Sequence, residues 1–334
     1  MGVVGVGRIG VRHAEALRGL PAVGAVVVGD ADAALAERVA SSLGVEAAAS
    51  VEEVVAGGVD ALVVAAPTPA HVSLLALAAA AGLPTFCEKP VALDLESLDA
   101  AIAEVGAAGI PVQVGFQRRF DPGYRAARDA VAGGAVGELL VLRAATHDPV
   151  PPADEYIARS GGIFRDLHIH DFDAIRFVTG REIVEVYADG AVRKSASFER
   201  YGDVDVAAAL VRLDDGALGV LTGARHDPRG YDVRLELVGT GDSIAVGVDA
   251  RSAYRSVEPD VHEPESGYAS FVDRFASAYR AELETFVTQV VAGGPSPCTL
   301  EDARAALAVA LAADRSRSER RPVRVEEVTP SAVA

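Results

Sequence analysis

A glycine-rich turn near the N-terminus constrains the fold of this 334-residue chain more than any other feature. The pattern G-x-G-x-x-G lies at residues 5–10, between an apolar run and an amphipathic stretch, and its expected cofactor-binding residues are Gly5, Gly7, Arg8, Ile9 and Gly10. At a strand-to-helix turn, the first glycine permits the tight bend, and the second lets the backbone approach a pyrophosphate. The third lets the helix pack closely on the strand. The helix N-terminus offers amide donors to phosphate oxygens. The pattern therefore predicts a dinucleotide-binding fold.

An acidic residue stands where a bound nucleotide requires one. Asp30 follows Gly10 by twenty residues and ends the second apolar run. A carboxylate at that place hydrogen-bonds the adenosine ribose hydroxyls and repels a 2′-phosphate. Asp32 could share this role, but Asp30 is at the strand end, and no Lys or Arg lies between Asp30 and Arg38. We therefore expect NAD rather than NADP as the cofactor.

Short apolar runs alternate with amphipathic stretches over the first 115 residues. Strands are expected at 2–6, 23–29, 61–65, 84–88 and 111–115, and helices at 9–20, 33–43, 69–81 and 94–108. This order predicts an α/β Rossmann domain, a parallel sheet with helices on both faces, which we assign to residues 1–118. Only four residues precede Gly5, so we expect either a short first strand or missing upstream residues.

After Phe116 the pattern changes to runs of strands with a few helices. Strands are expected near 138–146, 183–192, 204–213, 217–225, 231–238 and 243–248, and helices at 122–131, 166–179, 268–292 and 300–318. Such grouping predicts an α+β domain with a mostly antiparallel open sheet, which we assign to residues 119–334.

Composition excludes several classes of partner. The 31 basic and 48 acidic residues give a formal net charge of −17, which argues against nucleic acid or an anionic membrane surface. The longest apolar run, residues 73–83, is too short to span a bilayer, and the first residues do not resemble a signal peptide. Cys87 and Cys298 form neither a disulfide framework nor a metal motif. We expect a cytoplasmic protein with a small-molecule ligand.

Lysine is rare in this sequence, since Lys89 and Lys194 are its only two lysines. Unlike arginine, a desolvated lysine can change its protonation state, which suits a residue that takes part in chemistry. Lys89 ends a predicted strand, where open α/β sheets bind ligands, and Pro90 restricts its backbone to an extended conformation. We expect Lys89 to be catalytic, the alternative being that Glu88 and Lys89 are an exposed polar strand end.

The densest set of titratable side chains lies in residues 160–173. On a helix, Asp166 and His170 would share a face, and a carboxylate beside a histidine orients the ring and stabilises its protonated form. The alternatives are a carboxylate that caps the helix start and a core histidine. His168 and His170 would share a face only on a strand, so we expect no metal site.

Six segments along the chain together form the signature of one enzyme family. They are VGVGRIG (4–10), APTPAH (66–71), FCEKP (86–90), VGFQRRFDPGY (114–124), SGGIFRDLHIHDFD (160–173) and GYDVRLELVGTGDS (230–243). The set resembles the glucose-fructose oxidoreductase, inositol dehydrogenase and rhizopine catabolism protein (Gfo/Idh/MocA) family over nearly the whole chain. FQRRFDP and DPVPPADEYI (148–157) are most similar to inositol 2-dehydrogenases.

This resemblance implies NAD-dependent oxidation of a secondary hydroxyl on a cyclic polyol, as in myo-inositol 2-dehydrogenase. Lys89, Asp166 and His170 match the family's catalytic residues. We expect His170 to accept the hydroxyl proton, Asp166 to orient its ring, and Lys89 to hydrogen-bond the reacting oxygen. The alternatives are a related sugar or amino-sugar dehydrogenase and a catalytically silent NAD-binding regulator.

The resemblance also implies binding roles and an assembly. NAD contacts are implied for Thr68, His71, Glu88 and Lys89. Contacts with the polyol substrate are implied for Arg119 first and Arg118 second, and also for Asp148 and Tyr231. The family further implies a homotetramer formed through the second-domain sheets.

Overall fold

The computed structural model describes residues 1–261 and 266–329, which form two compact units. The first unit is Met1–Phe120 with Ser277–Arg304, and the second is the described part of Asp121–Ala276 with Ala305–Ala334. The first boundary lies within two residues of the one expected after residue 118. Residues 277–304, which we expected in the second domain, are part of the first unit.

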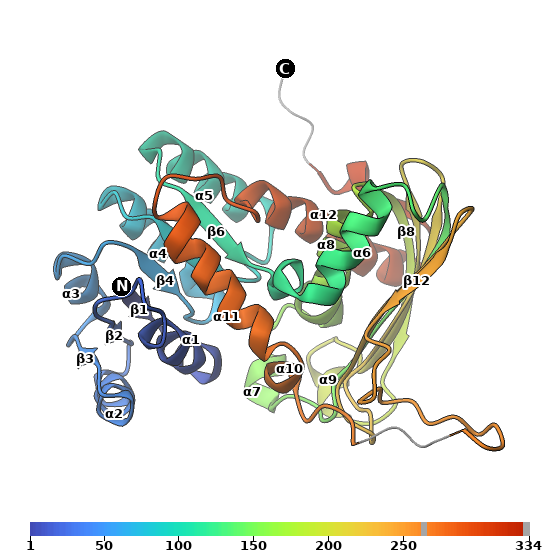
Figure 1. The fold of residues 1–334 in the computed structure, drawn as a ribbon, viewed down its shortest axis with the longest axis horizontal. Coiled ribbons are helices and arrows are strands. Elements are labelled where there is room, and N and C mark those ends of the chain that lie inside the picture. Colours follow the sequence, from blue (N-terminus) through green and yellow to red (C-terminus); the bar gives the residue numbers. More distant parts are fainter. Residues whose placement is uncertain (262–265, 330–334) are drawn as a thin grey trace. The chain divides into compact units, whose positions relative to one another are not determined.

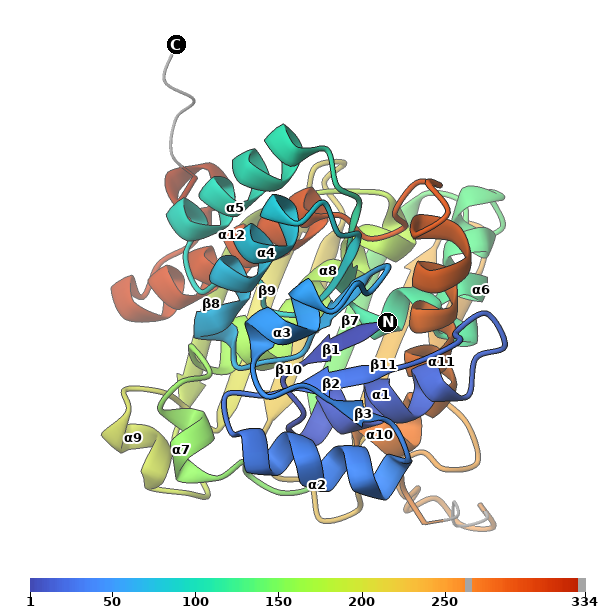
Figure 2. The same cartoon turned by 90° about the vertical axis from the view of Figure 1, so that its left-hand side faces the viewer.

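The first unit contains a six-stranded parallel sheet (Figure 2). Its strands are β1 (Gly2–Val4), β2 (Val27–Gly29), β3 (Glu46–Ala47), β4 (Leu62–Val64), β5 (Thr85–Glu88) and β6 (Val112–Gly115). They lie in the order β3-β2-β1-β4-β5-β6, and every neighbouring pair is parallel. The strand order reverses between β1 and β4, which is where such sheets bind ligands. The predicted Rossmann fold is confirmed.

Local capping explains where several helices of this unit begin and end. The helices are α1 (Arg8–Arg18), α2 (Ala33–Leu43), α3 (Val51–Ala56), α4 (His71–Ala80) and α5 (Leu95–Ala108). The side chains of Asp32, Ser50 and Asp94 each accept a hydrogen bond from the amide three residues on, at 3.1, 3.2 and 2.8 Å. Gly44 and Gly109, both in the left-handed conformation, end α2 and α5.

The helix expected at 268–292 is interrupted, which corrects the sequence prediction. α10 (Phe271–Arg274) ends at Phe275, and α11 (Ala276–Thr285) continues into a π-helical turn, Phe286–Val290. The chain passes from the second unit to the first between residues 276 and 277, so the two parts pack on different cores. Three side chains of the later part are fully buried in the core around β1, β2 and β5: Leu283, Phe286 and Val290.

The second unit is built on a seven-stranded sheet with helices on one face (Figure 1). Its strands are β7 (Leu139–His147), β8 (Ile183–Ala191), β9 (Val206–Leu213), β10 (Leu218–Ala224), β11 (Asp232–Gly239), β12 (Ser243–Val246) and β13 (Val323–Arg324). Its helices are α6 (Pro122–Ala132), α7 (Asp154–Ile157), α8 (Ile169–Thr179), α9 (Ser197–Arg200), α10 and most of α12 (Leu300–Glu319). The order is β12-β11-β7-β10-β9-β8-β13, with β7 and β10 as the parallel pair. The predicted, mostly antiparallel sheet is confirmed.

Side chains alternate across the central strands of this sheet. Along β9, Val206 is exposed and Ala207 buried, and the alternation continues to the end of the strand. One face therefore packs against helices. The other face carries Tyr187, Leu210 and Val220 and is open to solvent in the described part of the second unit.

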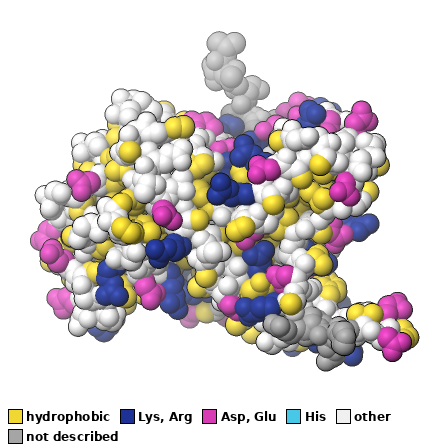
Figure 3. Space-filling model, viewed as in Figure 1, with side chains coloured by type: hydrophobic (Ala, Val, Ile, Leu, Met, Phe, Trp, Pro, Cys, Tyr) yellow, Lys and Arg dark blue, Asp and Glu magenta, His cyan; other side chains and the backbone are white. Residues whose placement is uncertain are grey.

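No helix among the described residues is long and apolar enough to cross a membrane. On the face drawn in Figure 3, basic and acidic side chains are interspersed. The charge visible on this face is therefore distributed rather than gathered into one patch.

Candidate functional site

The glycine turn joins β1 to α1 at the carboxyl edge of the parallel sheet. Gly5 has a φ of +85°, which glycine adopts without strain, and an added Cβ would lie 2.4 Å from the Ala66 amide nitrogen. The Gly5 amide donates to the Gly29 carbonyl at 2.9 Å. The turn is thus held between the ends of β2 and β4.

Gly7 leaves open space in front of α1. It is the N-cap of that helix, and an added Cβ would meet no protein atom within 4 Å. A diphosphate can therefore approach the amides of the first helical turn, which begins with Arg8 and Ile9, at the positive end of the helix dipole. The geometry and the chemistry fit the pyrophosphate of a dinucleotide.

Asp30 is fixed at the end of β2 by the turn itself. Its Oδ2 accepts a hydrogen bond from the Val6 amide at 2.8 Å, and its Oδ1 accepts one from the Asp32 amide at 3.0 Å. Each oxygen keeps a lone pair for a ribose hydroxyl. The Asp32 side chain instead caps α2. Of the two acids, Asp30 is thus the one hydrogen-bonded to the glycine turn.

His71 ties the end of β4 to the segment after β5. Its Nε2 lies 2.7 Å from the Ala66 carbonyl oxygen, and its Nδ1 lies 2.9 Å from the Pro90 carbonyl oxygen. A neutral ring can donate only one of these hydrogen bonds, and burial lowers the pKa of His71. Thr68 begins a short 3-10 helix, Thr68–Ala70. The NAD contacts of Thr68 and His71 stay predictions.

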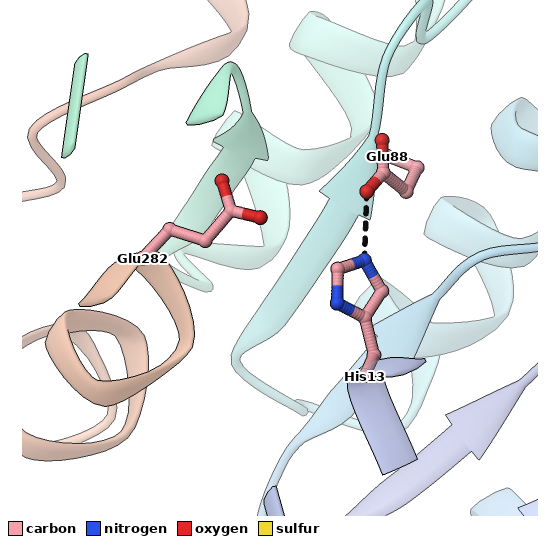
Figure 4. Close-up of side chains that lie close together, drawn as sticks. All are labelled: His13, Glu88 and Glu282. Atoms are coloured by element: carbon pink, nitrogen blue, oxygen red, sulfur yellow. Dashed lines mark hydrogen bonds and ion pairs between the residues drawn. The ribbon is translucent and has the colours of Figure 1, made fainter. Parts of the chain in front are cut away.

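Glu88 and Lys89 lie at the end of β5. Glu88 Oε1 lies 2.7 Å from His13 Nε2 (Figure 4), and Glu88 Oε2 accepts from the Lys89 amide at 3.1 Å. Glu88 is buried and Lys89 only partly so, and the Lys89–Pro90 peptide bond is cis. The structure thus holds Lys89 at the carboxyl edge of the sheet, with the Glu88 side chain turned into the interior.

His13 and Glu282 are buried close to Glu88, and the sequence motifs did not single them out. His13 lies on the buried face of α1, and Glu282, on α11, has no exposed surface. Burial raises the pKa of Glu282 well above its usual range, and the charge of Glu88 adds to this effect. The sequence signal that could have found Glu282 is an acidic residue within the apolar stripe of a helix. Acidic residues are seldom fully buried, so one in that position is unusual.

The two arginines expected to contact substrate lie in a short 3-10 helix, Gln117–Phe120, and both are buried. Arg119 Nη1 donates to Asp302 Oδ2 and to the Pro297 carbonyl, each at 3.0 Å. The structure therefore places Arg119 in an ion pair within the first unit. The substrate contacts of Arg118 and Arg119 stay predictions.

In the second unit, a buried arginine joins two of the predicted site residues. Arg225, which follows β10, donates from Nη2 to Asp166 at 2.6 Å and from Nη1 to Asp148 at 2.9 Å. Tyr156 donates its hydroxyl to the other oxygen of Asp166 at 2.7 Å. Burial disfavours the cation, but the two carboxylates outweigh burial and raise the pKa of Arg225. Arg225 thus keeps a positive charge between two carboxylates.

Asp166 lies in a π-helical turn, Phe164–His168, that leads into α8. Such turns are frequent at functional sites. Arg225 is 59 residues from Asp166 in the sequence, so no local pattern could pair them. Tyr156 is ten residues away, on the separate helix α7, and was missed for the same reason.

His168 and His170 have different surroundings. His168 is fully buried, with Nδ1 2.8 Å from Asp171 Oδ2. Its ring packs against Gly223, where an added Cβ would meet Nε2 at 2.3 Å. His170 is the second residue of α8 and is partly exposed. His168 is therefore a core residue, whereas His170 keeps some exposed surface, and its catalytic role stays a prediction.

Tyr231 packs in an aromatic cluster of the second unit. Its ring centroid lies 6.5 Å from that of Phe271 and 6.4 Å from that of Phe275. Its amide donates to the Tyr268 carbonyl at 2.7 Å. The substrate contact of Tyr231 stays a prediction.

Two groups of described residues place three potential metal ligands within 4.8 Å of one another. They are His13, Glu88 and Glu282 in the first unit, and His147, Asp227 and Asp232 in the second. Neither group contains His168 or His170.

Family models match both parts of the chain. Residues 1–116 match the oxidoreductase family with an NAD-binding Rossmann fold, and residues 124–245 match the C-terminal domain of the GFO/IDH/MocA family. The myo-inositol dehydrogenase Hyg17 of Streptomyces leeuwenhoekii is 42% identical over 317 residues, which are 94% of this chain and 96% of that protein.

Solved structures of similar proteins share the fold. A myo-inositol dehydrogenase from Corynebacterium glutamicum has a TM-score of 0.88 at 35% identity, covering 99% of this chain and 98% of that one. A scyllo-inositol dehydrogenase from Lactobacillus casei, with bound NAD(H) and scyllo-inositol, has a TM-score of 0.85 at 28% identity, covering 97% and 98%. The similarity thus extends over nearly the whole of each chain.

Gly7→Ala tests whether the open space in front of α1 receives NAD. The added methyl group meets no protein atom, so we expect the free energy of unfolding without NAD to change by less than about 1 kcal/mol. The methyl group would keep the pyrophosphate away from the helix amides, so the dissociation constant for NAD should rise about tenfold or more. Calorimetric titration with NAD measures it, and unchanged affinity would mean that the phosphates bind elsewhere.

Two further glycines serve as controls. A Cβ at Gly10 would lie 1.8 Å from the Gly5 carbonyl oxygen, so Gly10→Ala should lower the free energy of unfolding by about 3 kcal/mol. Gly106 lies exposed in α5 with no atom within 4 Å of an added Cβ. Gly106→Ala should therefore leave NAD binding unchanged and raise the stability by about 0.5–1 kcal/mol.

Proposed function

The chain belongs to the Gfo/Idh/MocA family of oxidoreductases with an NAD-binding Rossmann fold, and we propose that it oxidises a secondary hydroxyl of a cyclic polyol as a myo-inositol 2-dehydrogenase. The observation that carries the proposal is similarity to inositol dehydrogenases over nearly the whole of each chain. The residues that match the family's catalytic set, Lys89, Asp166 and His170, are all present.

In the proposed reaction, side chains of this protein handle the proton while the carbinol carbon loses a hydride. When bound, NAD supplies the acceptor for that hydride. His170 accepts the hydroxyl proton as general base. Lys89 donates a hydrogen bond to the same oxygen and stabilises its developing negative charge.

Asp166 supports His170 as an ionised carboxylate. Its oxygens accept hydrogen bonds from Tyr156 and Arg225. The Arg225 cation keeps Asp166 charged, and a charged carboxylate stabilises the imidazolium that forms when His170 takes the proton. We also propose substrate hydroxyl contacts for Asp148, Arg118, Arg119 and Tyr231.

A substrate panel tests the proposed activity. With NAD, we expect kcat/KM to be higher for myo-inositol than for its isomers, glucose, xylose or galactose. NADP should be a poorer cofactor, because Asp30 would repel its 2′-phosphate. A sugar as the best substrate would indicate a related sugar or amino-sugar dehydrogenase. NAD binding without turnover of any polyol would indicate a catalytically silent regulator.

Lys89→Ala and His170→Asn should each lower kcat by about 10²-fold or more, because each removes a group that acts on the reacting oxygen. Lys194→Ala, which removes the other lysine at an exposed position, is the matched control and should keep the wild-type kcat. Separate NAD titrations distinguish lost chemistry from lost cofactor binding. Wild-type turnover by Lys89→Ala would make Lys89 a polar strand end, and wild-type turnover by His170→Asn would remove its role as base.

We further propose that the open face of the second unit's sheet joins copies of this chain into a homotetramer. The register places Leu210 opposite Tyr187 and Val220, so the three side chains form one apolar row across β8, β9 and β10. They are 41–45% exposed. An exposed apolar row of this kind is typical of a protein interface.

Leu210→Asp places a charge in the middle of this row. We expect it to shift the tetramer toward smaller species, because burying an unpaired carboxylate opposes association. Val257→Asp, at an 85% exposed position outside the sheet, is the matched control and should leave the assembly unchanged. Sedimentation equilibrium measures the mass, and a wild-type monomer or an unchanged Leu210→Asp assembly would contradict the proposed interface.

We also propose the cytoplasm as the compartment of this protein. Cys87 and Cys298 are buried thiols, and burial raises the pKa of Cys87 well above its usual range. Two thiols without a disulfide fit a reducing environment. Fractionation of the producing cells, with the protein found outside the cytoplasmic fraction, would refute this assignment.

A further inference from the structure

Three buried side chains meet beneath the end of β5 (Figure 4). His13 comes from α1, Glu88 from β5 and Glu282 from α11, and none is more than 7% exposed. One ligand atom of each lies within 4.8 Å of those of the other two. In Figure 4, the carboxyl group of Glu282 points from its helix toward the other two side chains. The proposed proton transfer uses none of these side chains, so their arrangement needs another explanation.

Glu88 is the acceptor at the centre of this triad. It receives the His13 ring at 2.7 Å and the Lys89 amide at 3.1 Å, one on each oxygen. His13 Nδ1 is buried and has no hydrogen-bond partner among the described residues. A second N–H there would be a buried donor without an acceptor, which favours the ring protonated on Nε2. Glu88 is therefore a carboxylate with two donors and room for a third.

Glu282 lacks the partners that an ionised carboxylate needs. In residues 1–261 and 266–329, neither of its oxygens has a hydrogen bond. Among the described residues, Glu88 from β5 and His13 from α1 lie near its carboxyl group, and Gln113 from β6 donates its side-chain amide to the Glu282 backbone carbonyl at 2.9 Å. A second buried negative charge beside Glu88 would therefore be uncompensated.

We propose that Glu282 is a carboxylic acid whose hydroxyl group donates a hydrogen bond to the Glu88 carboxylate, and that the triad of His13, Glu88 and Glu282 positions the backbone of Lys89. One proton leaves the two carboxyl groups with a single negative charge. That charge then receives three donors, the Glu282 hydroxyl, the His13 ring and the Lys89 amide. The raised pKa of Glu282 agrees with this arrangement.

Glu282 is a positioning residue in this arrangement, because it acts on Lys89 only through Glu88. The proposed hydrogen bond from Glu282 holds the Glu88 carboxylate in the orientation that accepts the Lys89 amide. A shift of that amide would move the lysine at the proposed reaction centre, and small misplacements of reacting groups are costly in rate. The effect on turnover therefore rests on the proposed function, whereas the protonation of Glu282 does not.

Infrared spectroscopy at pH 7 tests the proton directly. We expect a protonated-carboxyl C=O band in the wild type that disappears in Glu282→Gln. Glu284→Gln, at an exposed position of the same helix, is the matched control and should keep the band. Identical spectra of the wild type and Glu282→Gln would overturn the proposal, whatever the protein oxidises.

Stability as a function of pH gives a second reading of the same proton. The folded protein holds the proton of Glu282 above the ordinary carboxyl pKa, so folding binds a proton that the unfolded chain releases. The wild type should therefore lose stability relative to Glu282→Gln as the pH rises from about 5 to about 8. A gain over this range would contradict a protonated Glu282.

Kinetics test the positioning role. Glu282→Leu removes the donor, and we expect kcat with NAD and myo-inositol to fall about tenfold or more. Glu282→Gln keeps a neutral donor of the same shape, and should restore kcat to within about threefold of the wild type. Equal losses in both variants would overturn the positioning role while leaving the proposed function intact.

Two further outcomes distinguish this proposal from the proposed function and from a metal site at the triad. If the wild type oxidises no polyol, the proposed function fails, and the infrared band still decides the protonation of Glu282. If purified wild type carries a stoichiometric divalent metal that Glu282→Gln lacks, an ion rather than a proton joins the triad and the proposal is overturned. Should Glu282→Leu fail to fold, the infrared and stability comparisons with Glu282→Gln carry the test.

Discussion

Parallel pairing around β1 is the constraint on which the rest of the structure depends. β1 pairs in parallel with β2 on one side and β4 on the other, so the carboxyl ends of these strands meet at one edge. That edge gathers the glycine turn and Asp30, and β5 adds Lys89 along the same sheet. The turn closes only because Gly5 and Gly10 lack side chains where backbone atoms approach them within 2.4 Å.

Two pairs of acidic side chains in this protein are compensated in different ways. Asp148 and Asp166 share the guanidinium group of Arg225. In our proposal, Glu88 and Glu282 instead share a proton. The difference bears on function, because Asp166 remains charged and can support a histidine cation, whereas the acid pair keeps one fixed charge next to the backbone of Lys89.

Local patterns predicted most strands and long helices, because helix caps and hydrophobic periodicity are set by residues that are close together in the sequence. The helix at 33–43 matches α2 at both ends, since Asp32 caps its start and Gly44 ends it. The prediction of one continuous helix at 268–292 was wrong, because the chain passes from the second unit to the first after residue 276. Two-residue strands such as β3 and single-turn helices such as α7 and α9 are too short to show a period.

The sequence by itself determined the Rossmann fold, the NAD-binding turn with Asp30, and the candidates Lys89, Asp166 and His170, because each of these is a short motif. Only the tertiary structure decided which partners the candidates have. Three of these pairs join distant segments of the chain. Arg225 and Asp166 are 59 residues apart, Asp302 and Arg119 are 183 apart, and His13 and Glu88 are 75 apart. Such pairs depend on burial, because a charge needs a partner only where water is excluded, and that condition arises only when the chain has folded.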